Sequence, residues 1–125
     1  MKQVISTPNA PAAVGTYSQA IVANGMVYAS GQLGLNPATG DFAGEDFKSQ
    51  AKQALKNVGA ILEAAGTSYD NVVKVSVFMS DMANFAALNE VYAQFFKAPY
   101  PARSAVAVKT LPKNGLVEIE VIAAL

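Results

Sequence analysis

The chain contains a single arginine, Arg103, whose guanidinium offers a planar fork of hydrogen-bond donors that suits a carboxylate. Arg103 lies in the segment YPARSAVAV, which covers residues 100–108. A short turn later, Glu118 and Glu120 place two carboxylates in a second apolar segment. Charged residues make up only 14% of the chain, so three charges in its two most strand-like C-terminal segments need a reason. The spacing fits a buried structural ion pair and, equally, an anion-binding pocket with a carboxylate beside it.

The two glutamates are expected to share one face of a strand. Residues two apart in an extended chain point the same way, so Glu118 and Glu120 face together while the valine and isoleucine residues between and around them face the other way. Such a pair in an apolar strand has at least one raised pKa unless a cation or several donors hold it. A carboxyl group with a raised pKa is useful for relaying protons or orienting water. The alternative is an Arg–Glu pair with the second glutamate in solvent or in an interface.

The composition excludes several kinds of chemistry. The chain has no histidine and no cysteine, which removes histidine general bases, thiol nucleophiles and the usual zinc sites, so we expect no metal. Nine basic and nine acidic residues cancel, and no basic stripe exists, which argues against nucleic acid as a partner. No apolar run approaches the roughly 20 residues of a membrane-spanning helix. The start, residues 1–5, lacks the apolar core of a signal peptide, so we expect a cytoplasmic protein.

The pattern of apolar residues predicts one α+β domain over residues 1–125. An Asn24-Gly25 turn between the apolar segments 17–23 and 26–31 predicts a β-hairpin. Helical spacing predicts a helix over about 46–65 that Gly66 ends, and a β-branched run predicts a strand over 72–79. A second helix is expected to carry Phe85, Leu88, Tyr92 and Phe95 on one face, and it precedes strands over about 104–109 and 117–124.

The predicted element order, ββαβαββ, has consequences for assembly. Two helices cannot cover both faces of one sheet, so we expect both on one face of a mixed sheet, with neighbouring copies of the chain on the other. Hydrophobic residues make up 52% of the chain and the mean hydropathy is +0.25, which is apolar for so small a domain. Both observations favour a homo-oligomer.

Four further residues could line a site, although each has a simpler explanation when taken alone. Tyr17 opens a strand, where core packing would explain it. Ser30 and Gly31 end the hairpin, and the chain has no histidine to activate the serine. Asn89 lies in the middle of a predicted helix, where asparagine is mildly unfavourable and can simply face solvent. Singly, these residues do not reveal a function.

Six short motifs nevertheless follow one another along the chain. They are Gly15-Thr16-Tyr17-Ser18-Gln19-Ala20, Ser30-Gly31-Gln32, Asn36-Pro37-x-Thr39-Gly40, Asn89-x-x-Tyr92-x-x-Phe95-Phe96, Pro101-Ala102-Arg103-Ser104 and Glu118-Ile119-Glu120. Their joint order and spacing is far more specific than any one of them. In this order they resemble the RidA/YjgF family of reactive intermediate deaminases, and the likeness runs nearly from end to end.

The resemblance implies a chorismate-mutase-like fold assembled as a homotrimer, with a barrel-like core and three clefts between subunits. It implies hydrolysis of reactive 2-enamine or 2-imine acids, such as 2-aminoacrylate and 2-aminocrotonate, to 2-oxo acids and ammonia. These intermediates leak from pyridoxal-phosphate-dependent dehydratases, and removing them protects such enzymes. The family enzyme needs no cofactor, so we expect none here, with small 2-imino and 2-oxo acids as partners.

The resemblance also implies roles for single residues. Arg103 would hold the substrate carboxylate and Glu118 would orient the attacking water and relay protons, which makes these two the expected catalytic residues. Glu120 would serve structure or the trimer interface. Tyr17 would pack over the substrate, Ser30 would supply a polar contact, and backbone groups near Ala105 would complete the water site. The residues expected to bind substrate are Tyr17, Ser30, Gly31, Asn89, Arg103 and Ala105.

The chain departs from the family pattern at three places. Thr16 stands where the family usually has proline, and Ala105 stands where many members have cysteine; residues 97–100 form a shorter segment than in many members. The competing hypothesis is a non-catalytic trimer that binds small carboxylic acids as a sensor, chaperone or regulator. A ribonuclease role, the label given to some members, is disfavoured by the zero net charge and the missing histidine.

Overall fold

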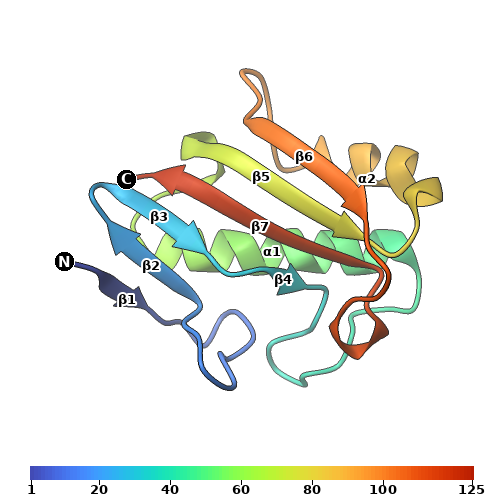
Figure 1. Cartoon of the computed structure of the whole chain (residues 1–125), viewed down its shortest axis with the longest axis horizontal. Coiled ribbons are helices and arrows are strands. Elements are labelled where there is room, and N and C mark those ends of the chain that lie inside the picture. The colour runs from blue at the N-terminus through green and yellow to red at the C-terminus, as the bar shows by residue number, and fades with distance from the viewer.

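The structure, a computed structural model, describes residues 1–125 and contains one mixed seven-stranded sheet with two α-helices (Figure 1). The helices are α1 (Phe47–Ala64) and α2 (Phe85–Tyr92). The strands are β1 (Gln3–Ile5), β2 (Ala20–Ala23), β3 (Met26–Ala29), β4 (Gln32–Leu33), β5 (Val72–Met79), β6 (Ala102–Ala107) and β7 (Val117–Ala124). Short 3-10 turns cover Tyr69–Asn71, Met82–Asn84 and Pro112–Asn114.

The sheet order is β1-β2-β3-β7-β5-β6, and the short β4 pairs with β7. Only β5 and β6 are parallel, because α2 connects them as a crossover. Strand β7 pairs antiparallel with both β3 and β5, which places the last strand of the chain at the centre of the sheet. The α+β class and the two helices on a mixed sheet are therefore confirmed.

Local sequence signals explain most of these elements. Asn24 and Gly25 both take left-handed φ values, 52° and 74°, as a two-residue hairpin turn requires. The Asp46 carboxylate accepts a hydrogen bond from the Ser49 backbone N–H at 3.0 Å and so caps the start of α1. Hydrogen bonding from the Ser49 side chain, and secondly from its backbone N–H, lowers the pKa of Asp46. Helix α1 ends at Ala64, shortly before Gly66.

Four predicted details were wrong. Strand β2 begins at Ala20 instead of residue 17, because the preceding segment is a loop held by the Gln19 side chain. Strand β6 covers 102–107 instead of 104–109, because its register follows β5. Phe95 lies beyond α2 and packs against Tyr69, with ring centroids 5.6 Å apart. The short strands β1 and β4 were not in the predicted order.

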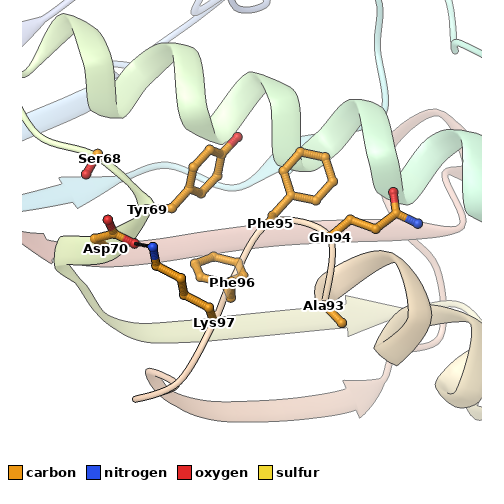
Figure 2. Close-up of a pocket in the computed structure, with 8 residues that line it drawn as sticks. All are labelled: Ser68, Tyr69, Asp70, Ala93, Gln94, Phe95, Phe96 and Lys97. Carbon is orange, nitrogen blue, oxygen red and sulfur yellow. Dashed lines mark ion pairs between the residues drawn. The ribbon is translucent and has the colours of Figure 1, made fainter.

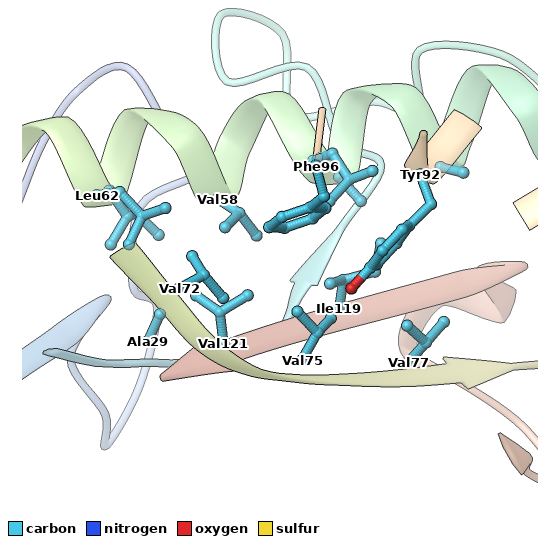
Figure 3. Packing of buried hydrophobic residues seen from close by; sticks show 14 of the residues in the cluster. Ala29, Val58, Leu62, Val72, Val75, Val77, Tyr92, Phe96, Ile119 and Val121 are labelled. Atoms are coloured by element: carbon cyan, nitrogen blue, oxygen red, sulfur yellow. The ribbon is translucent and has the colours of Figure 1, made fainter. Parts of the chain in front are cut away.

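Both helices bury their apolar residues against one face of the sheet. Figure 3 shows Val58 and Leu62 of α1 pointing toward Val75 and Val121 of the strands, with the Tyr92 and Phe96 rings beside them. Strand residues on this face alternate with residues on the opposite face, as the burial pattern of β7 shows. Neither helix combines the length and apolar character that crossing a bilayer requires.

The opposite face of the sheet carries no helix and is the face nearer the viewer in Figure 1. Glu118, Glu120, Ser76 and Phe78 lie on it, because they alternate with the fully buried core positions of β5 and β7. The register places Phe78 opposite Glu118 and Ser76 opposite Glu120. The prediction that the two glutamates share one face is therefore confirmed.

Candidate active site

Arg103 lies on the edge strand β6 and points to the helix-covered face of the sheet, since it pairs in register with the fully buried Val75. Its Nη1 donates a hydrogen bond of 2.9 Å to Asn89 Oδ1. The guanidinium carbon lies 4.7 Å from the Tyr92 ring centroid and 5.4 Å from that of Phe85. Arg103 makes no salt bridge, so the Arg–Glu ion pair considered above does not form within the chain.

A hollow of about 470 Å³ opens beside this guanidinium. Its lining combines the Arg103 side chain and the Asn89 amide with apolar surface from α2 and from the loop before β6. The lining residues are Asn89, Tyr92, Ala93, Tyr100, Pro101 and Arg103. A half-buried guanidinium without an acidic partner, at the wall of a hollow, is suited to bind a small anion.

Glu118 belongs to a second group of residues on the open face. Gly31 lies directly against its side chain: a Cβ built on Gly31 would stand 2.8 Å from Glu118 Cδ and 3.0 Å from Oε1. The absence of a side chain at residue 31 therefore makes room for this carboxylate. Burial, and secondly the charge of Glu120, raise the pKa of Glu118.

Ser30 and Tyr17 are connected to this second group through the loop before β2. The Ser30 hydroxyl donates a hydrogen bond of 2.6 Å to the Ser18 carbonyl. Because its only proton is used there, the hydroxyl can bind a ligand only by accepting a hydrogen bond. Tyr17 precedes Ser18 and is 54% exposed, although its sequence context alone suggested packing in a core.

The structure thus brings the predicted site residues together in two groups. Arg103, Asn89 and Ala105 lie on the helix-covered side, where Ala105 pairs with the fully buried Val77. Gly31 and Glu118 lie on the open side, separated from Arg103 by the thickness of the sheet. No single copy of the chain can direct both the guanidinium and the Glu118 carboxylate at one small molecule.

A second hollow, drawn in Figure 2, lies between the turn at 68–70 and the segment after α2. Its two charges pair with each other, with Lys97 Nζ 3.8 Å from Asp70 Oδ1. The Tyr69 hydroxyl donates to the Leu55 carbonyl at 2.6 Å, and burial raises the pKa of this tyrosine to about 12. Since these polar groups are already engaged, the hollow beside Arg103 is the better candidate site. No cluster of acidic side chains is arranged to hold a metal ion.

Comparison with known proteins identifies the family of this chain. Residues 7–125 match the family described as Endoribonuclease L-PSP. The chain belongs to this family, the RidA/YjgF family. The chain is 52% identical to Reactive Intermediate Deaminase A, chloroplastic, of Arabidopsis thaliana, over 99% of its own length and 66% of that protein. It is 50% identical to the 2-iminobutanoate/2-iminopropanoate deaminase of Capra hircus, over 98% of its own length and 90% of the relative.

Solved structures of RidA/YjgF proteins share the fold. A putative endoribonuclease L-PSP from Entamoeba histolytica is 49% identical and superimposes with a TM-score of 0.97 over the whole of both chains. E. coli TdcF with bound serine is 44% identical and gives a TM-score of 0.94 over 98% of each chain. At these identities the likeness extends to the family as well as to the fold.

Sequence reasoning missed the two aromatic residues that contact Arg103. Phe85 and Tyr92 were predicted to share one apolar face of the second helix, and Tyr92 is indeed buried, with 5% of its surface exposed. The available signal was the spacing Phe85-x-x-x-Asn89-x-x-Tyr92, which puts both rings and the amide on one helix face. Only the position of β6 shows that this face meets the arginine.

Proposed function

We propose that this RidA/YjgF chain hydrolyses 2-imino acids and their enamine tautomers to 2-oxo acids and ammonia. Water adds to the C=NH2⁺ carbon, and the product is a C=O group with release of NH4⁺, so atoms and charge balance without a cofactor. The relative from Capra hircus is described as a deaminase of 2-iminobutanoate and 2-iminopropanoate, which are small acids of this kind. The observation that carries the proposal is that Arg103 lies half-buried at the wall of a hollow and has no acidic partner.

Arg103 would bind the substrate carboxylate through its remaining N–H groups and so fix the adjacent imine carbon. Asn89 already uses Nη1, which orients the guanidinium before substrate arrives. Ser30 would accept a hydrogen bond from the substrate nitrogen, because its own proton is held by the Ser18 carbonyl. A protonated imine offers such an N–H, whereas the 2-oxo acid product does not.

Glu118 would orient the attacking water and take up its proton. Partial burial and the neighbouring Glu120 raise the pKa of Glu118, which brings this carboxyl group closer to the range where it exchanges protons readily. A protonated imine is already electrophilic, so positioning of water needs no stronger base. Tyr17, exposed on the same loop as Ser18, would cover the substrate.

The site would be shared between copies of the chain in a homotrimer. Arg103 and Glu118 face opposite sides of the sheet, so a complete site requires the helix side of one copy next to the open sheet face of another. The open face carries exposed apolar side chains such as Tyr28 and Val106, at 48% and 47% exposure, which a neighbouring copy would cover. The cytoplasmic location expected above stays a prediction.

A coupled assay tests the activity. A threonine or serine dehydratase generates the enamine, and the decay of the imine and the appearance of 2-oxo acid are followed with wild type and with Arg103→Ala. We expect acceleration by wild type alone. No acceleration by wild type would overturn the deaminase proposal.

Mixing two inactive variants tests the shared site. If each site takes Arg103 from one copy and Glu118 from another, assemblies formed from equal amounts of Arg103→Ala and Glu118→Gln chains contain intact sites at roughly a quarter of positions. Activity should therefore return to about that fraction of wild type. In the control, each variant is refolded and mixed with itself. If activity does not recover in the mixture of the two variants, both residues belong to the site of one chain.

The second candidate function is binding of small carboxylic acids without catalysis. One relative is described as a putative regulator, AldR of Lactococcus lactis, and TdcF was solved with bound serine. Binding needs Arg103 but not Glu118. A Glu118→Ala variant therefore separates the two functions, since a deaminase would lose turnover while a binding protein would keep its ligand affinity.

A further inference from the structure

One face of α2 presents three residues to the Arg103 guanidinium. Phe85, Asn89 and Tyr92 are spaced four and three residues apart, which brings them onto one side of the helix. Both ring centroids lie within the roughly 6 Å over which a cation is attracted to an aromatic face. The Asn89 amide lies between them in sequence and accepts from Nη1. The guanidinium is thus held by neutral groups only.

We propose that Phe85 and Tyr92 are positioning residues that set the orientation of the Arg103 guanidinium for the substrate carboxylate. The inference rests on the proposed function in that Arg103 is the carboxylate-binding group. Both rings act through the arginine, although Tyr92 also contributes to the lining of the hollow.

The physical reason is the flexibility of a free arginine side chain. Arginine has many rotamers, and holding it in one orientation during binding costs entropy that lowers affinity. Contacts of the guanidinium with two aromatic rings, together with one hydrogen bond to Asn89, fix the group beforehand. Neither ring supplies an oxygen acceptor, so the N–H groups other than the one bonded to Asn89 stay available for a carboxylate.

An acidic residue could hold the arginine more strongly, but it would also neutralise the charge. Phe85 and Tyr92 orient the guanidinium without competing for its hydrogen bonds, which is what a site for an incoming anion needs. The same logic explains why an amide, Asn89, stands at the polar position between them.

The Tyr92 hydroxyl is not part of this contribution. Its oxygen is buried without a hydrogen-bond partner, and Figure 3 shows it directed toward the strands, away from solvent. Burial raises the pKa of Tyr92 although the Arg103 charge opposes the shift, so the ring stays neutral. An unpaired buried hydroxyl is costly, which leaves the aromatic ring as the useful part of this side chain.

The test compares ring removal with ring conservation at the same position. Tyr92→Leu and Phe85→Leu are assayed for KM and kcat in the dehydratase-coupled reaction and for binding of 2-oxobutanoate by calorimetry. We expect each to raise KM and the Kd for 2-oxobutanoate about fivefold to tenfold, with kcat changed less than about twofold. Tyr92→Phe, which keeps the ring, should restore KM to within about twofold of wild type.

Phe95→Leu is the matched control. Phe95 follows α2 and packs against Tyr69 instead of Arg103, so its loss removes an aromatic ring from the same region without touching the guanidinium. Its KM should stay at the wild-type value even if its melting temperature falls. Phe85 is 36% exposed, so Phe85→Leu is expected to fold and keeps the test decisive if Tyr92→Leu does not.

Three outcomes would overturn the inference: an unchanged KM in Phe85→Leu, an equal rise of KM in Phe95→Leu, or a rise in Tyr92→Phe as large as in Tyr92→Leu. These are distinct from failure of the proposed function. If wild type shows no turnover, the deaminase proposal fails, and the calorimetric Kd still tests the two rings provided that Arg103→Ala abolishes binding. If neither turnover nor carboxylate binding is found in wild type, both proposals fail.

Discussion

Replacing Gly31 by alanine would displace the Glu118 carboxylate while leaving the backbone unchanged. Gly31 has no left-handed φ, so alanine is compatible with its conformation. The new Cβ would stand 2.8 Å from Glu118 Cδ and 2.9 Å from Cγ, where ordinary contact begins near 3.4 Å. The carboxyl group must therefore retreat by about 0.6 Å, the difference between 2.8 and 3.4 Å. Its atoms are at the end of a flexible side chain, so it can do so.

The energetic consequences separate stability from activity. A rotated Glu118 side chain costs about 0.5–1.5 kcal/mol, and the lower entropy of the unfolded alanine chain returns about 0.4–1 kcal/mol. The free energy of unfolding should thus change by less than about 1 kcal/mol. A misplacement of about 1 Å at a reacting group can cost about 100-fold in rate, so a shift of about 0.6 Å should lower kcat/KM about tenfold.

The assay is the dehydratase-coupled reaction, with urea unfolding of the same preparations. Gly44→Ala is the matched control, because its Cβ would press on Ser49 at 2.7 Å, which is a similar clash at the start of α1. The reasoning is refuted if Gly31→Ala keeps the wild-type kcat/KM, or if Gly44→Ala loses as much. A loss of more than about 3 kcal/mol in unfolding free energy for Gly31→Ala would show that the backbone had moved as well.

Three further changes have directions set by the structure. Asn89→Asp would place a carboxylate on the Arg103 guanidinium and compete with the substrate, so KM should rise about tenfold and more than in Asn89→Ala, as steady-state kinetics would show. Gln19→Ala removes four hydrogen bonds to the loop at Thr7, Ala10 and Pro11 and should lower the unfolding free energy by about 2–4 kcal/mol in urea titrations; a loss below about 0.5 kcal/mol would contradict this. The pKa of Glu118 is raised above 4.5, so the folded chain keeps its proton longer than the unfolded chain, and stability should fall as the pH rises through the window just above 4.5. Glu118→Gln should remove this fall when unfolding is measured from about pH 4 to 7, and an identical pH profile in both proteins would argue against it.

Elements with strong local signals could be predicted from the sequence almost to the residue. Strands β5 and β7 have the predicted bounds, because β-branched residues alternate along both. The hairpin at Asn24-Gly25 and helix α1 followed equally from turn chemistry and helical spacing. The start of β2 could not be predicted in this way, since the Gln19 side chain replaces backbone pairing with bonds to a distant loop.

The arrangement of the site depended on register, which the sequence does not show. Alternation within one strand places Glu118 and Glu120 on the same face, but it says nothing about Arg103 on another strand. The pairing of Arg103 with Val75 and of Glu118 with Phe78 decides that the two charges face opposite sides. For the same reason, a pattern that predicts a core stripe on α2 could not reveal its contact with the arginine.

The separation of Arg103 from every acidic side chain of its own chain explains how the site keeps its charge. Had β6 been shifted by one residue, Arg103 would have pointed to the face that carries Glu118 and Glu120, where an ion pair would neutralise it. In the observed register the guanidinium meets only an amide and two aromatic rings. Its positive charge is therefore left for an anion from outside the chain, and under the proposed function Glu118 would contribute to a site completed by another copy.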